Sequence, residues 1–290
     1  MKYGVTLANR ELGGGPDAIK DFVQAVEGAG FNHVLAAEHV AGGHPDRQKP
    51  GERVHTFEQP YHEPFVLFGF IAAVTRTLEM VTSILILPQR QTFVVAKQAA
   101  ELDLLSGGRV RLGVGLGRNW MEYEVLNENF KNRGRRVEEQ IEVLRKLWTE
   151  EMVTFEGKYH HIDRMGLNPN SIQKPIPIWM GTYTQVVEHA VERVARIADG
   201  WFPQFQPGPE FEALLERFRG YARAAGRDPA SIGIECGLRI DPAAGPEKWA
   251  EQVEAFRKLG ATHLRIGVAG EPGGMQQMID TLTRFREAVD

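Results

Sequence analysis

The sequence predicts an α/β fold, a (β/α)8 barrel, from three observations. Short apolar segments that suit buried strands alternate with longer segments whose apolar residues recur every three or four positions, as on one face of a helix. This alternation repeats eight times along the chain. The connections are mostly short, which favours parallel strands, and eight strand–helix units fill one barrel. An open, doubly wound sheet is the alternative architecture.

The chain has 290 residues, of which 42% are hydrophobic, and a formal net charge of −4. This size predicts one globular domain over residues 1–290. No apolar run approaches the roughly 20 residues of a bilayer span and no secretory signal is present, so we expect a cytoplasmic protein without a membrane partner. The balanced charge argues against nucleic acid as a partner. The single cysteine, Cys236, lies in an expected strand and suits a small core residue.

The first four units follow from apolar runs and helix signals. Their expected strands are residues 2–7, 33–37, 78–87 and 109–117. The first helix begins at Pro16 and ends at Gly30, and the second, residues 64–75, is almost wholly apolar and therefore buried. Pro88 ends the third strand, and the third helix ends at the glycine pair 107–108. The buried face of that helix is formed by Val95, Ala99, Leu102 and Leu105.

The second half continues the pattern after one interruption. The apolar face of its first long helix is formed by Val137, Ile141, Leu144 and Leu147. Residues 151–175 then break the alternation with a hairpin that turns at Glu156 and Gly157, and we interpret them as an insertion after the fourth helix. The remaining strands are expected at residues 176–180, 199–202, 232–240 and 263–268, each followed by an amphipathic helix.

In a (β/α)8 barrel the functional residues lie on the loops that follow the strands. Glu38 and His39 end the second strand, and a histidine there can exchange a proton near neutral pH. His39 is therefore our candidate acid or base, with Glu38 as the neighbour that orients it or contacts a cofactor. A purely structural histidine is the alternative. Residues 40–62 are too long for a simple connection and are typical of a lid or binding loop.

Alternate glycines end the fourth strand, at Gly113, Gly115 and Gly117. They either let a large ligand lie against bare backbone or relieve crowding inside a narrow barrel, and their spacing does not distinguish the two. The spacing also differs from the dinucleotide-binding fingerprint, whose third glycine comes three residues after the second.

Three further features allow both a ligand-binding and a structural interpretation. Thr182 and Thr184 precede an expected helix, whose backbone N–H groups suit a phosphate, but Thr182 and Gln185 also have capping-box spacing. Arg118 either adds a positive charge to a site or is simply solvated. Trp201 either stacks on a flat ring or belongs to the core. We expect no metal site, because no strand end carries the His-x-His of a metal hydrolase.

Taken in order, several short motifs make the whole chain resemble the bacterial luciferase-like superfamily of flavin and deazaflavin oxidoreductases. They are Glu-His-Val at residues 38–40, Pro-Gln-Arg at 88–90, Leu-Ser-Gly-Gly-Arg at 105–109, Gly-Val-Gly-Leu-Gly at 113–117, Pro-Ile-Trp-Met-Gly at 177–181 and Ala-Asp-Gly-Trp-Phe-Pro at 198–203. The order and spacing of these motifs are specific. The chain is most similar to the branch that depends on coenzyme F420, a deazaflavin.

The resemblance implies a (β/α)8 barrel with a non-prolyl cis peptide at Ser83–Ile84, where a bulge supports the flavin ring. It also implies that phosphate is held after the fourth and fifth strands and that His39 is an active-site residue. The cofactor-binding residues implied in this way are Ser83, Ile84, Gly115, Leu116, Gly117, Arg118, Asn119, Gly181, Thr182, Tyr183 and Thr184. Leu116 and Tyr183 depart from the residues of several relatives, and Arg118 is expected to supply the missing charge.

From the resemblance we expect an enzyme that transfers a hydride between coenzyme F420 and a small organic substrate. FMN is the alternative cofactor, in a monooxygenase that receives reduced flavin from a separate reductase. A different class, a cofactor-free barrel isomerase or hydrolase, would place the phosphate of its substrate in the same site. The resemblance also implies a homodimer.

Overall fold

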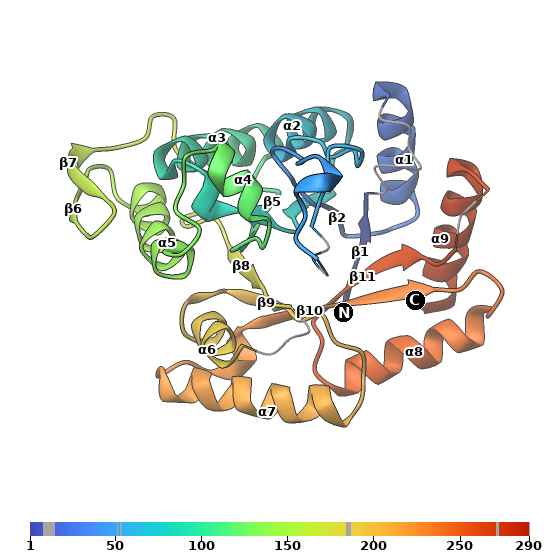
Figure 1. Ribbon diagram of the computed structural model, residues 1–290. Coiled ribbons are helices and arrows are strands. Elements are labelled where there is room, and N and C mark those ends of the chain that lie inside the picture. Colours follow the sequence, from blue (N-terminus) through green and yellow to red (C-terminus); the bar gives the residue numbers. More distant parts are fainter. Residues whose placement is uncertain (8–14, 51, 53, 184–186, 271–272, 290) are drawn as a thin grey trace. The chain divides into compact units, whose positions relative to one another are not determined.

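The computed structural model describes residues 1–7, 15–50, 52, 54–183, 187–270 and 273–289. Strands and helices alternate along these residues, and their strand–helix units number eight when the broken third strand is counted once (Figure 1). This succession is that of a (β/α)8 barrel, so the predicted fold class is confirmed. In the described part of the chain, every helix falls short of the length or the apolar character that a bilayer span requires.

The chain divides into two compact units, and the expectation of a single domain over residues 1–290 stays a prediction. The first unit comprises Met1–Ala36, Val74–Val81 and Trp179–Asp290. Its strands follow one another in the order β3-β2-β1-β11-β10-β9-β8. The strand bounds are β1 Lys2–Thr6, β2 His33–Ala36, β3 Glu79–Thr82, β8 Ile178–Gly181, β9 Gly200–Phe202, β10 Gly233–Ile240 and β11 His263–Val268. The helix bounds are α1 Pro16–Gly28, α6 Glu188–Ile197, α7 Pro209–Ala224, α8 Pro246–Lys258 and α9 Met275–Val289, with a 3₁₀ turn at Pro229–Ser231.

Apolar residues of neighbouring strands meet in the core of the first unit. Val5 pairs in parallel with Val34 on one side and with Ile266 on the other, and all three side chains are buried. Each helix adds an apolar stripe, which in α9 consists of Met278, Leu282 and Phe285. Cys236 is fully buried in β10, and burial raises the pKa of its thiol to about 12. The predicted core role of Cys236 is therefore confirmed.

The second unit comprises Ala37–Ala73 and Thr82–Ile178. Its strands are β4 Leu85–Ile86, β5 Val110–Gly115, β6 Val153–Glu156 and β7 His161–Met165. Its helices are α2 Pro64–Val74, α3 Thr92–Ser106, α4 Trp120–Val125 and α5 Arg133–Thr149, with 3₁₀ turns at Pro45–Arg47 and Leu87–Gln89. β4 pairs in parallel with β5, and the indole of Trp148 in α5 donates a hydrogen bond to the Ala96 carbonyl of α3. The antiparallel pair β6–β7 follows α5, which is the helix of the fourth strand–helix unit, and this confirms the predicted insertion.

The third barrel strand is interrupted where the sequence predicted one continuous strand over residues 78–87. β3 ends at Thr82, a cis peptide joins Ser83 to Ile84, and β4 contains only Leu85–Ile86. The cis bond lies where the resemblance placed it, so that prediction is confirmed. Pro88 lies inside a 3₁₀ turn that follows β4, so it does not itself end the strand.

Two details of the predicted helices are wrong. Leu105 is 68% exposed, because the buried stripe of α3 runs from Val95 and Leu102 to Ser106 and leaves Leu105 on the solvent side. The helix expected close after Thr182 begins only at Glu188, so Thr182 does not cap it. Gln185, the other residue of the expected capping box, lies outside the described residues.

Candidate active site

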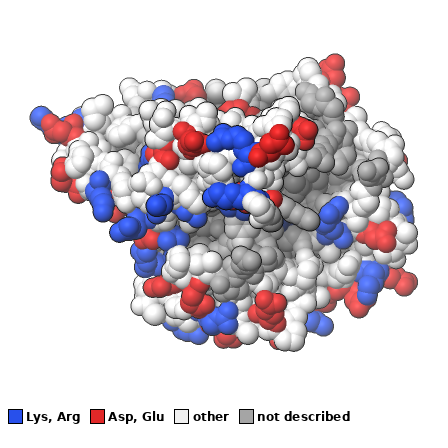
Figure 2. Space-filling model, in the orientation of Figure 1, with Lys and Arg blue, Asp and Glu red and all other residues white. Residues whose placement is uncertain are grey.

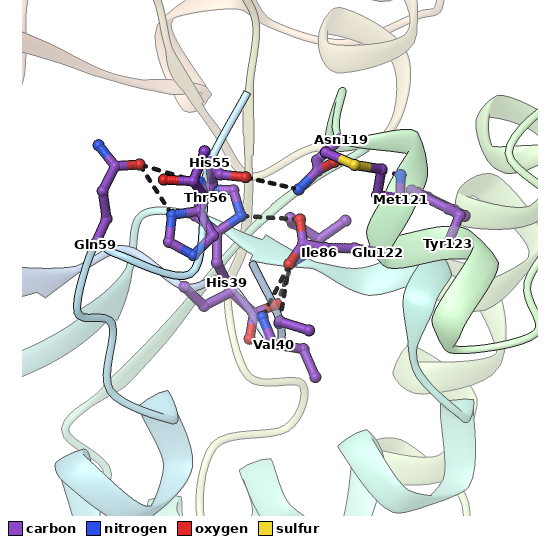
Figure 3. Close-up of polar contacts among 12 residues, drawn as sticks. His39, Val40, His55, Thr56, Gln59, Ile86, Asn119, Met121, Glu122 and Tyr123 are labelled. Carbon is purple, nitrogen blue, oxygen red and sulfur yellow. Dashed lines mark hydrogen bonds and ion pairs between the residues drawn. The ribbon is translucent and has the colours of Figure 1, made fainter. Parts of the chain in front are cut away.

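His39 is held by a carboxylate of α4 (Figure 3). Its Nδ1 lies 2.9 Å from Glu122 Oε2, and the Glu122 side chain is fully buried. A carboxylate accepts hydrogen bonds, so His39 donates through Nδ1–H, and its second nitrogen, Nε2, is the one available to a ligand. The His39 side chain is 24% exposed, and Nε2 has no hydrogen-bond partner among the described residues. The contact with Glu122 thus fixes the His39 ring and leaves Nε2 without a partner among the described residues.

Glu122 is fixed by two backbone N–H groups as well as by His39. Its Oε1 accepts hydrogen bonds from Val40 N–H at 2.9 Å and from Ala41 N–H at 3.5 Å. A capping box was the signal that could have located Glu122, because Asn119 is the N-cap of α4 and Glu122 stands three residues later. The glutamate of a capping box usually turns back to the N-cap. Here it reaches residues 39–41 instead, and sequence reasoning missed it.

Two aromatic side chains from residues 40–62 enclose the His39 ring. The His55 ring stacks on it, with centroids 4.3 Å apart and planes 18° apart, and Tyr61 meets both rings edge-on. Burial, and secondly the proximity of His39, lower the pKa of His55 below its ordinary value. The sequence predicted a binding loop here but not these residues, because the segment has no periodic pattern.

Residues 40–62 form contacts within the segment and with α4. Phe57 N–H donates to the Gly43 carbonyl at 3.3 Å. Gly42 lies so close to this turn that a Cβ atom on it would be 2.2 Å from the Phe57 nitrogen. The Trp120 indole of α4 donates to a carboxylate oxygen of Glu52 at 3.2 Å. These contacts fix the path of the segment around His39.

The expectation that Glu38 orients His39 is wrong. Glu38 Oε1 accepts the Ile86 N–H at 2.6 Å, and Glu38 Oε2 forms an ion pair with Arg90, which also reaches Glu63 at 3.0 Å. Burial raises the pKa of Glu38 above its ordinary value, and Arg90 opposes only part of that rise. Both residues lie beyond the end of β2 at Ala36, and there Glu38 turns toward β4 while His39 turns toward Glu122.

Ser83 and Ile84 are half-buried, whereas the residues on either side of them are buried. The Ile84 side chain lies against Gly115, where a Cβ atom would be 1.7 Å from Ile84 Cδ1. A Cβ atom on Gly117 would be 2.7 Å from Ile86 Cγ2. These glycines therefore make room for isoleucines, which supports the interpretation that they relieve crowding and not the one that they expose bare backbone to a ligand. The surface that this packing leaves is the apolar, half-exposed side of Ile84.

The loop after β5 contains part of the predicted phosphate site. Leu116 is half-buried, and its carbonyl accepts a hydrogen bond from the Tyr123 hydroxyl. The Asn119 side chain is almost fully buried: its oxygen accepts from Met121 N–H at 3.2 Å and its amide donates to residue 55 at 3.4 Å. Arg118 is exposed. Arg118 is thus the positively charged side chain among the cofactor-binding residues predicted in this loop, and it lies at the surface.

The other predicted phosphate residues follow β8, in the first unit. Gly181 ends β8, the Thr182 hydroxyl accepts a hydrogen bond from the Trp201 indole at 2.9 Å, and Tyr183 is 53% exposed. Thr184 lies outside the described residues. Trp201 is fully buried and stacks on Phe218, with ring centroids 4.6 Å apart. Its interpretation as a core residue is therefore the correct one.

Within the described residues, no group of three or more histidine, cysteine and carboxylate side chains converges as metal ligands do. The adjacent histidines of the insertion have separate partners. His160 pairs with Glu139 at 2.8 Å, and His161 pairs with Glu156 at 2.6 Å. Both histidines therefore take part in contacts of the hairpin.

The sequence matches one known family over almost its whole length, because residues 1–288 match the family described as luciferase-like monooxygenase. The chain belongs to this family. It is an oxidoreductase of the luciferase-like class.

Two relatives and one solved structure illustrate what this luciferase-like protein is similar to. It is 33% identical over 222 residues to an uncharacterized protein of Mycobacterium tuberculosis, covering 73% of this chain and 75% of that protein. It is 32% identical over 238 residues to an F420-dependent glucose-6-phosphate dehydrogenase of Segniliparus rotundus, covering 78% of this chain and 66% of that protein. The solved structure of monooxygenase RslO1 from Streptomyces bottropensis has a TM-score of 0.79 at 19% identity, covering 100% of this chain and 98% of that one. This last likeness shows the shared fold.

Proposed function

We propose that this luciferase-like enzyme transfers a hydride between coenzyme F420 and a small organic substrate, with His39 as the acid or base. The observation that carries the proposal is the hydrogen bond between His39 and Glu122, which places a proton on Nδ1 and leaves Nε2 to a ligand. A relative that is 32% identical is named as F420-dependent, which favours F420 over FMN. FMN, in a monooxygenase supplied by a separate reductase, is the alternative.

The residues of the second unit fit a bound deazaflavin. Ile84, packed against Gly115, offers an apolar and half-exposed surface of the kind on which a flat ring lies. Arg118 would pair with a phosphate of the cofactor, since a guanidinium binds phosphate oxygens in pairs. A bound deazaflavin would supply the hydride or take it up.

His39 would handle the proton that accompanies the hydride. When an alcohol is oxidised, its carbon loses a hydride and its hydroxyl oxygen loses a proton, which His39 Nε2 accepts. In the reverse direction the same nitrogen returns the proton to the carbonyl oxygen. Glu122 stabilises the positive charge that the ring then carries, because its Oε2 accepts the Nδ1–H at 2.9 Å. A positioned acid or base of this kind contributes about 10²–10⁴-fold to the rate.

Binding titrations test the proposal. F420 and FMN are each added to the protein, and absorbance and fluorescence are followed. We expect saturable binding of F420 that is tighter than that of FMN. Arg118→Ser should weaken F420 binding about tenfold through the loss of a charge-assisted hydrogen bond. Arg164→Ser is the matched control, because Arg164 is 78% exposed on the insertion.

Failure of both cofactors to bind would contradict the proposal. Tighter binding of FMN, together with oxygen consumption by the reduced flavin complex, would replace it by the monooxygenase alternative. Turnover of a phosphorylated substrate without any flavin would point to the cofactor-free class instead.

The cellular setting and assembly are also proposals. We infer a cytoplasmic homodimer. We also infer that it binds neither nucleic acid nor membranes, because its formal net charge is −4 and both of these partners are anionic. Sedimentation velocity measures the assembly, and a monomer at micromolar concentration would contradict the dimer.

A further inference from the structure

His55 contacts the candidate acid–base residue face to face. The centroids of the His55 and His39 rings are 4.3 Å apart, and the two planes differ by 18°. Figure 3 shows the two rings between Gln59 on one side and Glu122 on the other. Tyr61 meets the two rings edge-on, with centroid distances of 4.8 Å to His39 and 4.7 Å to His55. The His39 ring is thus confined on one face and at one edge.

The stacked position of His55 is fixed independently of His39. Gln59 Oε1 lies 3.1 Å from His55 Nδ1 and accepts the Thr56 N–H at 3.4 Å. Because a backbone N–H only donates, the Gln59 atom is the acceptor, and His55 donates its Nδ1–H. The Asn119 amide donates to the His55 carbonyl at 3.4 Å and fixes the backbone as well.

These hydrogen bonds give the two rings different electrostatic surroundings. Both rings donate through Nδ1, but His39 donates to the carboxylate of Glu122 and His55 to the neutral amide of Gln59. A positive charge is therefore stabilised on His39, whereas His55 is 9% exposed and hydrogen-bonds a neutral amide. Burial and the proximity of His39 lower the pKa of His55, and the charge of Glu122 opposes only part of this effect. Two positively charged rings at this distance would repel each other. Tyr61 is the other titratable side chain in contact with the pair.

We propose that His55 is a positioning residue that holds the plane of the His39 ring in one orientation. When the pair of rings takes up a proton, His55 stays neutral and the proton is on His39 Nε2. The proposal rests on the proposed acid–base role of His39. A neutral aromatic ring attracts a cation over its face, so the stack also favours the protonated form of His39.

Nitrogen-15 NMR of the imidazole rings tests the proposal between about pH 5 and 9, the range in which histidines change charge. We expect the His55 signals to keep the pattern of a neutral Nδ1–H ring throughout this range, because burial and the proximity of His39 lower its pKa. In His55→Ala the His39 signals should broaden or shift, because the ring loses its support. In His55→Phe, which retains a flat ring, they should stay close to those of the parent.

Kinetics provide the second readout. We expect kcat of His55→Ala to fall about tenfold with little change in KM, and His55→Phe to recover most of the loss. The matched control is His44→Ala. His44 lies on the same segment, its side chain is 61% exposed, and its ring stacks on Phe57 at 5.9 Å. This control should leave both the spectrum of His39 and kcat unchanged.

Unchanged His39 signals in His55→Ala would overturn the proposal. Protonation of His55 within this pH range would overturn it too. If neither F420 nor FMN binds, the proposed function fails, but the NMR signals still decide whether His55 positions His39. The two failures are therefore distinguishable.

Discussion

We propose that the reactivity of His39 depends on a carboxylate that lies 83 positions away in the sequence and 2.9 Å away in space. Glu122 acts in two ways: its charge favours the protonated ring, and its position directs Nε2 away from α4. Replacing the carboxylate by an amide removes the charge and retains the size of the side chain. The contribution of the charge is therefore measurable by itself.

Glu122→Gln is expected to lower kcat at least tenfold, because the protonated ring loses its negative partner. Steady-state kinetics measures the effect. Glu124→Gln is the matched control, since Glu124 is 59% exposed and pairs with Arg47. An unchanged kcat in Glu122→Gln would contradict this role.

Gly115→Ala is expected to displace the Ile84 side chain, because the new methyl group would lie 1.7 Å from Ile84 Cδ1. Overpacking of this kind costs about 1–3 kcal/mol. The displaced side chain would enter the half-exposed side that we assign to the cofactor, so F420 binding should weaken too. Urea unfolding and F420 titration measure the two effects. Adding Ile84→Ala should restore the stability, and no restoration would show that the clash is not the cause.

The sequence predicted His39 as a site residue, which stays a prediction, and it missed the partners of His39 for a physical reason. A strand-end histidine is a local feature, whereas the contacts of His39 with Glu122 and His55 arise only when distant segments fold together. Glu38 was the expected partner because it is adjacent in the chain, but the two adjacent side chains have different partners, Ile86 and Arg90 for Glu38 and Glu122 for His39. At Gly115 the spacing of the glycines indicated that a side chain is absent there, but it did not show that the Ile84 side chain occupies the space.

At the scale of elements, the insertion hairpin is tied to α3 and α5 by a short chain of hydrogen bonds. Glu139 of α5 accepts hydrogen bonds from the backbone of residues 158–159 at 2.9 and 2.7 Å and lies 2.8 Å from His160 Nδ1. His160 Nε2 lies 2.6 Å from the Thr92 hydroxyl at the start of α3, and the Gln140 amide donates to the same hydroxyl at 3.1 Å. The hydroxyl therefore donates to Nε2, and the hairpin is fixed at its tip.

Glu139→Gln is expected to destabilise the protein at neutral pH and not in strong acid. Burial raises the pKa of Glu139, but hydrogen bonds from His160 and the hairpin backbone outweigh this effect, so the pKa lies below the ordinary value of 4.5. A carboxyl group with a lowered pKa stabilises the fold above its ordinary pKa, and this contribution is lost as the pH falls through the lowered value. Thermal unfolding at several pH values measures the difference in Tm.

The control for Glu139→Gln is Glu142→Gln, an exposed position on the same helix. It should have the Tm of the parent at every pH. A difference in Tm between Glu139→Gln and the parent that does not change with pH would contradict the role of the charge.

Most elements were predictable because apolar spacing is a local property. The stripe of Val137, Ile141 and Leu144 predicted α5, and all three side chains are buried in it. The predictions were wrong where the surroundings decide. Leu105 has helical spacing but faces solvent, and Thr182 has capping-box spacing but accepts a hydrogen bond from an indole of β9.

At the scale of the whole molecule, a buried hydrogen bond between a histidine and a glutamate of the first unit joins two strands that are not neighbours. His33 of β2 and Glu235 of β10 are separated in the sheet by β1 and β11. His33 Nε2 nevertheless lies 2.8 Å from Glu235 Oε1, and both side chains are fully buried. Gly4 of β1 makes this possible, because a Cβ atom on it would be 2.1 Å from His33 Nε2. The pair thus crosses the inner face of the sheet over a residue without a side chain.

Glu235→Ala is expected to destabilise the protein by about 3–5 kcal/mol, because it leaves His33 buried without this acceptor. Urea unfolding followed by circular dichroism measures the change. Glu247→Ala, at an exposed position in the first turn of α8, is the matched control and should stay within about 0.5 kcal/mol of the parent. A loss for Glu235→Ala no larger than that of the control would show that the pair is dispensable.

The ring that stacks on His39 belongs to a surface segment and not to a strand, and this has a consequence for engineering. Surface segments tolerate replacement far better than strands do. A directed-evolution library at the exposed residues Phe57, Glu58 and Pro60 keeps Gln59 and Tyr61 in place. We expect it to change substrate choice while the proposed dyad of His39 and Glu122 keeps its contacts. Gly42 has to be kept in every clone, because any side chain there would collide with the Phe57 backbone 2.2 Å away.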